Sequence, residues 1–262
     1  MRDILERLVH GEITVDDAER ELRVDVVEKV GGVARLDISR SVRRGVPEII
    51  LAEGKSDADI ITICKSMLTQ TGRAIVSRLS DNQLSLLKRT FSGQYRFEEF
   101  AHSRCLVIKQ TNFAVKQTGG KVGILTAGTA DLGVAEEAAM IAKEVGCETF
   151  LEVDAGVAGI HRLAEPLTKL VRCNVDCIIV VAGREGALPT VVAGLVDAPI
   201  IAVPTSSGYG YGGGGTAALM AMLQACSLGL AVVNIDGGIA AGVVASLIAN
   251  RVAQARANRS SL

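Results

Sequence analysis

Polar segments that follow apolar runs hold the side chains best suited to chemistry. The first is Thr126-Ala-Gly-Thr-Ala-Asp131, where hydroxyl groups, small residues and a carboxylate precede an amphipathic stretch. Backbone N–H groups at the N-terminus of a helix attract anions, so Thr126, Gly128 and Thr129 are candidates for binding a phosphate group. In the alternative interpretation, Thr129 or Asp131 only caps the helix that follows.

The second polar segment is Asp154-Ala-Gly-Val-Ala-Gly-Ile-His161-Arg162. Its small residues would allow a ligand to approach the backbone closely. His161 is the only histidine after residue 118. A lone histidine is often structural, but its place beside Arg162, after an apolar run, favours a role in binding. Asp154, His161 and Arg162 are therefore candidate site residues.

The third segment, Ala182-Gly-Arg-Glu185-Gly-Ala-Leu-Pro189, places a carboxylate at the end of another apolar run. A carboxylate at the mouth of a parallel sheet can act as a general base. The alternative is that Glu185 is the N-cap of a helix predicted over residues 186–196.

The fourth segment is a glycine-rich loop that starts at Pro204. Gly208, Gly210 and Gly213 satisfy the dinucleotide-binding pattern G-x-G-x-x-G. However, four residues separate the preceding apolar run from Gly208, and only 26 residues follow Asp236, too few for the rest of a dinucleotide-binding domain. We therefore predict a phosphate or substrate loop, with Ser206 and Gly208 as candidate contacts.

Cys226 lies near the end of a helix predicted over residues 214–228. A buried cysteine is usually a small hydrophobic residue, and the C-terminus of a helix disfavours a thiolate. A nucleophilic role would need a cationic neighbour or a cationic substrate. The last polar segment, Asn234-Ile-Asp236-Gly-Gly, adds Asn234 and Asp236 to the candidates.

The elements that must position these residues form an alternating pattern. Apolar runs at 122–126, 149–153, 177–182, 199–203 and 230–235 predict buried strands, and the stretches between them, at 131–145, 162–173, 186–196 and 214–228, with another after 241, predict helices. Such alternation predicts an α/β fold with a parallel sheet covered on both faces. Ligands bind such sheets outside the carboxyl ends of the strands, where the polar segments lie.

A domain boundary is expected between residues 118 and 119. Residues 1–118 contain 7 glycines and residues 119–262 contain 21. The first part predicts two leading helices, at 2–9 and 14–22, and then a small α/β domain. Its strands are predicted at 47–51, 73–79 and 104–109, and its helices at 57–71 and 81–90.

Composition argues against several classes of protein. The net charge is −1, aromatic residues make up 3% and tryptophan is absent, so we expect no nucleic-acid partner. No run of 18 unbroken apolar residues and no secretion signal is present, so we expect no membrane span. The six cysteines are scattered, which indicates a reducing cytoplasm rather than a disulfide framework.

A stretch without charge predicts a subunit interface. No Asp, Glu, Lys or Arg occurs between Ala198 and Ile235. The stretch could simply form core helices. We favour a homo-oligomer, because an apolar helix exposed on a monomer favours association.

Together, the strand-end segments resemble one known family. They are Thr-Ala-Gly-Thr-Ala-Asp at 126–131, Asp-Ala-Gly-Val-Ala-Gly-Ile-His-Arg at 154–162, Glu-Gly-Ala-Leu-Pro-Thr-Val-Val-Ala-Gly at 185–194, Ala-Val-Pro-Thr-Ser-Ser-Gly-Tyr-Gly at 202–210 and Val-Asn-Ile-Asp-Gly-Gly at 233–238. They closely resemble the carboxylases of nickel-pincer cofactor biosynthesis, the LarB family. More distantly, residues 119–262 are similar to the aminoimidazole ribonucleotide (AIR) carboxylases of purine synthesis, the PurE family. Arg44-Gly-Val-Pro-Glu-Ile-Ile-Leu-Ala-Glu-Gly-Lys55 extends the likeness into the first part.

The resemblance implies a flavodoxin-like three-layer fold, assembled as a tetramer or octamer. It implies carboxylation of the pyridinium ring of nicotinic acid adenine dinucleotide at carbon 5, using carbon dioxide or bicarbonate. Hydrolysis of the phosphoanhydride would then give pyridinium-3,5-biscarboxylic acid mononucleotide and AMP. Neither biotin nor ATP would be needed, and magnesium is expected to offset the charge of the diphosphate.

By the same resemblance, Cys226 matches the nucleophile of the family. A thiolate adduct at carbon 4 would make the electron-poor ring nucleophilic at carbon 5, and the cationic ring could supply the charge that a helix end denies the thiolate. Glu185 is our choice of base, with Asp131 and Asp154 as competitors. The implied binding roles are phosphate or ribose for Thr126, Gly128 and Thr129, and diphosphate or carboxylate for His161 and Arg162.

Two other functions stay open. PurE enzymes carry a histidine in a segment Ala-Ala-His-Leu-Pro-Gly, whereas this chain reads Glu185-Gly-Ala-Leu-Pro-Thr190, which favours the pyridinium substrate. A carboxylase or mutase acting on aminoimidazole ribonucleotide remains the main alternative. The other is a non-catalytic oligomer that binds a dinucleotide.

Overall fold

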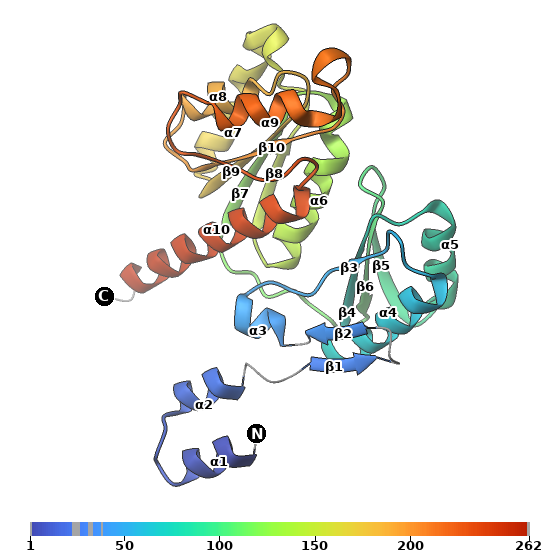
Figure 1. The fold of residues 1–262 in the computed structure, drawn as a ribbon. Helices are drawn as coiled ribbons and strands as arrows, with labels where there is room; N and C mark the ends of the chain where they lie inside the picture. The colour runs from blue at the N-terminus through green and yellow to red at the C-terminus, as the bar shows by residue number, and fades with distance from the viewer. Residues whose placement is uncertain (1, 23–26, 31–33, 38, 261–262) are drawn as a thin grey trace. The chain divides into compact units, whose positions relative to one another are not determined.

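The computed structural model describes residues 2–22, 27–30, 34–37 and 39–260 (Figure 1). The chain divides into two compact units. The first comprises Met1–Glu99 and Arg104–Phe113, and the second comprises Phe100–Ser103 and Ala114–Leu262. The main division thus falls between residues 113 and 114, whereas the glycine content placed it between 118 and 119.

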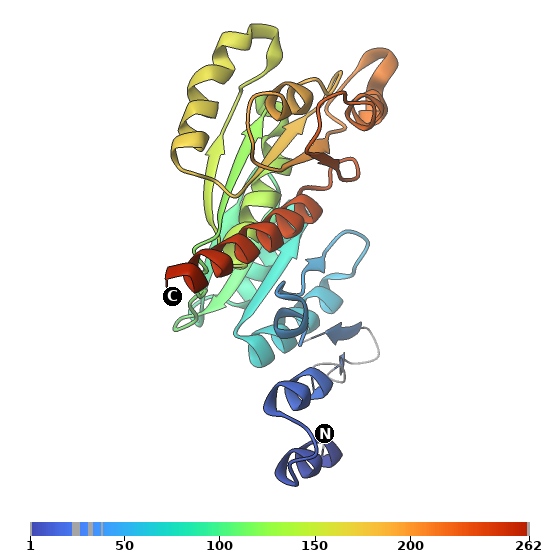
Figure 2. The ribbon, with the colours of Figure 1, turned by 90° about the vertical axis from the view of Figure 1, so that its left-hand side faces the viewer.

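The described part of the carboxy-terminal unit has a five-stranded parallel sheet in the order β11-β10-β9-β7-β8. Figures 1 and 2 show this sheet with helices packed around it. The strands are β7 Lys121–Thr126, β8 Glu148–Glu152, β9 Cys177–Ala182, β10 Ile200–Pro204 and β11 Leu230–Val232. Every residue of β9 is buried, which explains its unbroken apolar sequence, because both faces of a central parallel strand are covered.

Helices cover both faces of this sheet. They are α6 Leu132–Glu144, α7 Ala164–Arg172, α8 Leu188–Ala193, α9 Thr216–Leu223 and α10 Gly238–Ser260. One apolar cluster joins α6 and α10 to the sheet, and a second joins α7, α8 and α9 to the sheet. The predicted three-layer α/β fold with five strands is therefore confirmed.

Helix α10 is long and apolar enough to cross a membrane by length and composition, with a mean hydropathy of 1.3 over an 18-residue window within Gly238–Arg259. In this structure its small residues pack on α6. A Cβ atom at Gly242 would lie 2.7 Å from the carbonyl oxygen of Ala138, and Ala245 and Ala249 are fully buried. This packing is that of a core helix.

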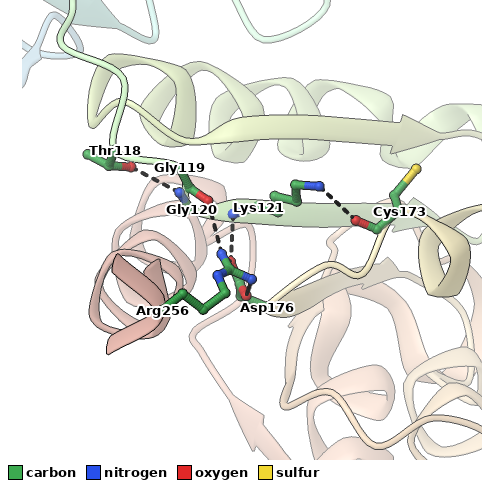
Figure 3. Close-up of polar contacts among 7 residues, drawn as sticks. All are labelled: Thr118, Gly119, Gly120, Lys121, Cys173, Asp176 and Arg256. Carbon is green, nitrogen blue, oxygen red and sulfur yellow. Dashed lines mark hydrogen bonds and ion pairs between the residues drawn. The ribbon is translucent and has the colours of Figure 1, made fainter. Parts of the chain in front are cut away.

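A polar network ties the end of α10 to the amino-terminal edge of the sheet (Figure 3). Arg256 donates to both carboxylate oxygens of Asp176, at 2.8 and 3.0 Å, and to the carbonyl of Gly119 at 3.0 Å. The Asp176 side chain is only 3% exposed and also accepts the backbone N–H of Lys121 at 2.8 Å. The network therefore joins α10 to the starts of β7 and β9.

The amino-terminal unit has its own sheet, in the order β3-β4-β6-β5. Its strands are β3 Ile50–Leu51, β4 Arg73–Ser77, β5 Tyr95–Phe100 and β6 Cys105–Gln110, and its long helices are α4 Asp57–Thr71 and α5 Asp81–Thr90. Two leading helices, α1 Arg2–Val9 and α2 Val15–Leu22, precede it. The expected small α/β architecture is present. Strand β5, the hairpin of β1 Val27–Val30 with β2 Ala34–Asp37, and α3 Arg40–Arg44 had not been predicted.

Candidate active site

Loops at the carboxyl ends of β7, β8, β9 and β10 line an open cleft of about 460 Å³. The lining includes Ala127, Gly128, Ala130, Asp131, Gly156, Arg162, Arg184, Glu185, Ser207 and Tyr209. The cleft thus lies at the edge of the sheet where ligands bind in parallel α/β folds. Gly128, Asp131, Arg162 and Glu185 are the sequence candidates that line it.

Asp131 is a buried connection between two of these loops. Its side chain accepts the backbone N–H of Gly128 at 3.0 Å, the Thr205 hydroxyl at 2.6 Å and the Ser207 hydroxyl at 2.9 Å. Asp131 is 4% exposed. Within the described residues it makes no side-chain cap on α6, so its bonds serve to hold the loops after β7 and β10 together.

Thr126 and Asp154 connect the ends of β7 and β8. The fully buried Thr126 accepts the backbone N–H of Asp154 at 3.0 Å. The carboxylate of Asp154 pairs with Arg162 at 3.0 Å. Arg162 also donates weakly to the carbonyl of Gly156 at 3.4 Å. These contacts hold a cation at the cleft, although both partners of the ion pair remain partly exposed.

Glu185 is an exposed carboxylate that lines the cleft. Within the described part of the chain, no hydrogen bond or ion pair engages it. Helix α8 begins at Leu188 with Ala187 as its N-cap, so Glu185 does not cap the helix. It differs in this from Asp131 and Asp154, whose carboxylates already have partners.

The glycine-rich loop is anchored at both ends. Asp236 accepts the backbone N–H of Ser206 at 2.9 Å, and the backbone N–H of Asp236 donates to the carbonyl of Pro204 at 2.9 Å. At Gly215, where φ is +82°, a Cβ atom would lie 3.0 Å from the carbonyl oxygen of Thr205. Ser206 and Asp236 thus hold the loop, whereas Ser207 and Tyr209 line the cleft.

Four other candidates lie outside the cleft lining. They are Thr129, His161, Gly208 and Asn234. His161 is exposed in the turn before α7. Asn234 accepts the backbone N–H of the next residue, Ile235, at 2.9 Å. Gly208 packs against the backbone of Arg184, and a Cβ atom there would lie 3.1 Å from the Arg184 nitrogen.

Cys226 lies at the other edge of the sheet. Helix α9 ends at Leu223, not at residue 228 as the sequence predicted, so Cys226 occupies the exposed turn before β11. Because β10 and β11 are parallel, this turn lies at their amino-terminal ends. Gly229, three residues further on, accepts the N–H of Ile200, the first residue of β10. Within one chain, Cys226 and Glu185 are therefore not brought together.

The structure also adds cleft residues to which the sequence had assigned no role. Arg184 follows β9 with φ +53°, in the left-handed region that residues other than glycine seldom adopt. Its guanidinium lies over the ring of Tyr209, 4.3 Å from the centroid. The signals were visible in the sequence as a strand-end arginine and a tyrosine between glycines.

Comparisons with known proteins agree with this architecture. The AIR carboxylase family model matches residues 121–260, and the model of the LarB/PurE-like N-terminal domain matches residues 27–110. A Methanocaldococcus jannaschii relative named "Uncharacterized protein MJ0165" is 42% identical over 251 residues, which cover 95% of this chain and 96% of the relative. The N5-carboxyaminoimidazole ribonucleotide mutase of the same organism is 35% identical over 124 residues, which cover 47% of this chain and 74% of that protein.

Both matched domains indicate a carboxylase-type enzyme. The chain belongs to the AIR carboxylase family, as a LarB-like, PurE-related protein with the N-terminal domain of that group.

Proposed function

We propose that this protein carboxylates nicotinic acid adenine dinucleotide at carbon 5 of the pyridinium ring. It then hydrolyses the phosphoanhydride to release pyridinium-3,5-biscarboxylic acid mononucleotide and AMP. The observation that carries the proposal is a LarB-type N-terminal domain joined to an AIR carboxylase domain that has Glu185 at the cleft and no histidine in Glu185–Thr190. The proposal places this chemistry in the cytoplasm.

The carboxylation step needs no oxidant and no activated carboxyl donor. The thiolate of Cys226 adds to carbon 4, and the ring electrons move to give an enamine that is nucleophilic at carbon 5. Carbon 5 forms a bond with carbon dioxide, a base removes the proton from carbon 5, and the thiolate leaves as the aromatic ring reforms. The balance is one carbon dioxide gained and one proton released, without biotin or ATP.

Glu185 is best placed to remove that proton, because its carboxylate is exposed at the cleft without a protein partner in the described chain. Arg162 would face the diphosphate or the pyridine carboxylate from one wall of the cleft. His161, exposed beside Arg162, would add a donor at the cleft edge. Asp131 and Thr126 would position these loops rather than take part in proton transfer.

This chemistry requires a second copy of the chain, because Cys226 lies at the edge of the sheet opposite to the cleft. In the proposed homo-oligomer, a tetramer or octamer, Cys226 of a neighbouring copy enters the cleft. The surface around Cys226 supports such an assembly. Met220, Leu223 and Leu228 are 62, 64 and 90% exposed, and exposed apolar residues of this kind favour association.

Magnesium would enter with the substrate. Among the described residues, no three His, Cys, Asp or Glu side chains gather into a metal-binding group. Mg²⁺ usually keeps several waters and is held by one or two carboxylates together with substrate phosphates. The two oxygens of Asp131 already accept hydrogen bonds, so phosphate oxygens of the dinucleotide would supply most of the ligands of Mg²⁺ other than water. The bound ion would offset the negative charge at the scissile anhydride.

Product analysis tests the proposal. The purified protein is mixed with nicotinic acid adenine dinucleotide, bicarbonate and magnesium, and the products are analysed by mass spectrometry. The expected products are AMP and a mononucleotide that is heavier than nicotinic acid mononucleotide by one carbon dioxide, about 44 Da, as covalent carboxylation requires. Absence of both products would overturn the proposal.

A second candidate is a PurE-type carboxylase or mutase. The similarity to the N5-carboxyaminoimidazole ribonucleotide mutase favours it. It predicts turnover of an aminoimidazole ribonucleotide by a Cys226→Ala variant, because that ring is already an enamine-like nucleophile. Turnover of this substrate, and not of the dinucleotide, would select the second candidate.

A further inference from the structure

Aromatic side chains are scarce in this chain, yet two tyrosines lie in one glycine-rich loop. The sequence has three tyrosines and no tryptophan. Tyr209 and Tyr211 are 76% and 112% exposed, although aromatic rings are usually at least partly covered. Of the two, Tyr209 lines the cleft.

One face of the Tyr209 ring carries a cation. The guanidinium carbon of Arg184 lies 4.3 Å from the ring centroid, within the distance at which cation and ring attract each other. Arg184 also lines the cleft. The pair therefore presents two stacked planar groups at the cleft, and the ring remains largely open to solvent.

The backbone holds the pair in place. A Cβ atom at Gly208 would lie 3.1 Å from the backbone nitrogen of Arg184, and one at Gly183 would lie 2.4 Å from the Ser207 hydroxyl. The loops after β9 and β10 thus touch through glycines. Arg184 adopts φ +53°, a conformation that is strained for a residue other than glycine and is concentrated at functional sites.

We propose that Arg184 and Tyr209 form a stacking subsite for the purine base of a nucleotide in the cleft. Every nucleobase has a π face, and stacking on an aromatic ring beside an arginine is a general way to bind a base. A site for phosphate alone would use the arginine and leave the open face of the Tyr209 ring without a ligand. The inference rests on the proposed function only for the ligand: the adenine of the dinucleotide would occupy this subsite while its pyridinium ring lies near Glu185.

The absence of tryptophan allows a direct test with AMP as the probe. In a Tyr95→Phe background, which keeps the edge-to-face packing on Phe91, tyrosine fluorescence reports only Tyr209 and Tyr211. We expect AMP to quench this fluorescence and ribose 5-phosphate, which has no base, to leave it unchanged.

Calorimetry with variants completes the test. Tyr209→Leu should weaken AMP binding roughly 5- to 150-fold, the range expected for loss of one base stack, and should leave binding of ribose 5-phosphate unchanged. Arg184→Lys, which keeps the charge without the planar group, should also weaken AMP binding. Tyr211→Leu is the matched control, because Tyr211 is in the same loop but not in the cleft lining, and should bind AMP as the wild type does.

Equal AMP affinity in the wild type and Tyr209→Leu would overturn the subsite. So would an equal loss in Tyr209→Leu and Tyr211→Leu, because it would indicate an effect on the loop rather than a stack. AMP binding that depends on Tyr209, in a protein that does not carboxylate the dinucleotide, would support the subsite and refute the proposed function. A protein that carboxylates the dinucleotide, but whose AMP binding does not depend on Tyr209, would support the proposed function and refute the subsite.

Discussion

Asp131→Asn is the substitution most informative about the architecture of the cleft. The carboxylate is 4% exposed and accepts three hydrogen bonds, from Gly128, Thr205 and Ser207. Asparagine has the same shape but only one acceptor oxygen. If that oxygen accepts the two hydroxyl groups, the new NH₂ group faces the N–H of Gly128, and two donors oppose each other.

The cost follows from these contacts. A hydrogen bond to a charged group contributes about 1.5–3 kcal/mol, and an unsatisfied buried donor costs about 1–3 kcal/mol. These two energies overlap, because the contribution of the lost hydrogen bond already includes part of the cost of leaving its donor unsatisfied. Asp131→Asn should therefore lower the free energy of unfolding by about 2–4 kcal/mol. It should also raise the KM, because Gly128 and Ser207 line the cleft.

Urea unfolding followed by circular dichroism measures the change. Asp197→Asn is the control, because Asp197 is exposed in the same unit, and it should shift the free energy of unfolding by less than about 0.5 kcal/mol. A change below about 1 kcal/mol for Asp131→Asn would refute the conclusion that this carboxylate holds the loops together.

Three further predictions concern the edge of the sheet, the thiols and the assembly. Arg256→Ala should lower the free energy of unfolding by about 1–3 kcal/mol, less than for a fully buried pair, because the arginine is 41% exposed. Arg251→Ala, at an exposed position of the same helix, is the control. Equal losses of unfolding free energy in the two variants would contradict the role of the network in Figure 3. Burial raises the pKa of the Cys64 thiol to about 12, so at pH 8 roughly one such thiol in ten thousand is ionised. Peptide mapping after treatment with iodoacetamide should therefore find the exposed Cys226 modified and Cys64 intact. The Cys226→Ala and Glu185→Gln variants should each be inactive. If each site takes the two residues from different copies, oligomers assembled from equal amounts of the two variants should regain roughly a quarter of the wild-type activity. A mixed oligomer without activity would contradict the shared site.

The carboxy-terminal sheet could be predicted because its signal is local. Strands such as β9 are unbroken apolar runs, and the order of elements along the chain then places every strand end at one edge. Gly128, Asp131, Arg162 and Glu185 were found in this way. Strand β5, Tyr95-Arg-Phe-Glu-Glu-Phe, was missed because charged residues interrupt its apolar residues.

The position of Cys226 was not anticipated, because its expected role as nucleophile came from a family resemblance, which identifies a residue without placing it in one chain. The connectivity could have located it. A residue between a helix and the next parallel strand lies at the amino-terminal edge, opposite to the ligand edge. The stacking of Arg184 on Tyr209 could not be predicted, since it depends on the close approach of two loops through glycines.

Isotope incorporation tests the central claim most directly. The wild type, Cys226→Ala and Cys173→Ala are each incubated with nicotinic acid adenine dinucleotide, magnesium and ¹³C-labelled bicarbonate, and the label on the pyridine ring is followed by mass spectrometry. Cys173 is the control, because it is partly exposed but lies before β9, away from the proposed chemistry. The account predicts labelled product from the wild type and Cys173→Ala and none from Cys226→Ala. Labelled product from Cys226→Ala at the wild-type rate would contradict covalent catalysis by this cysteine.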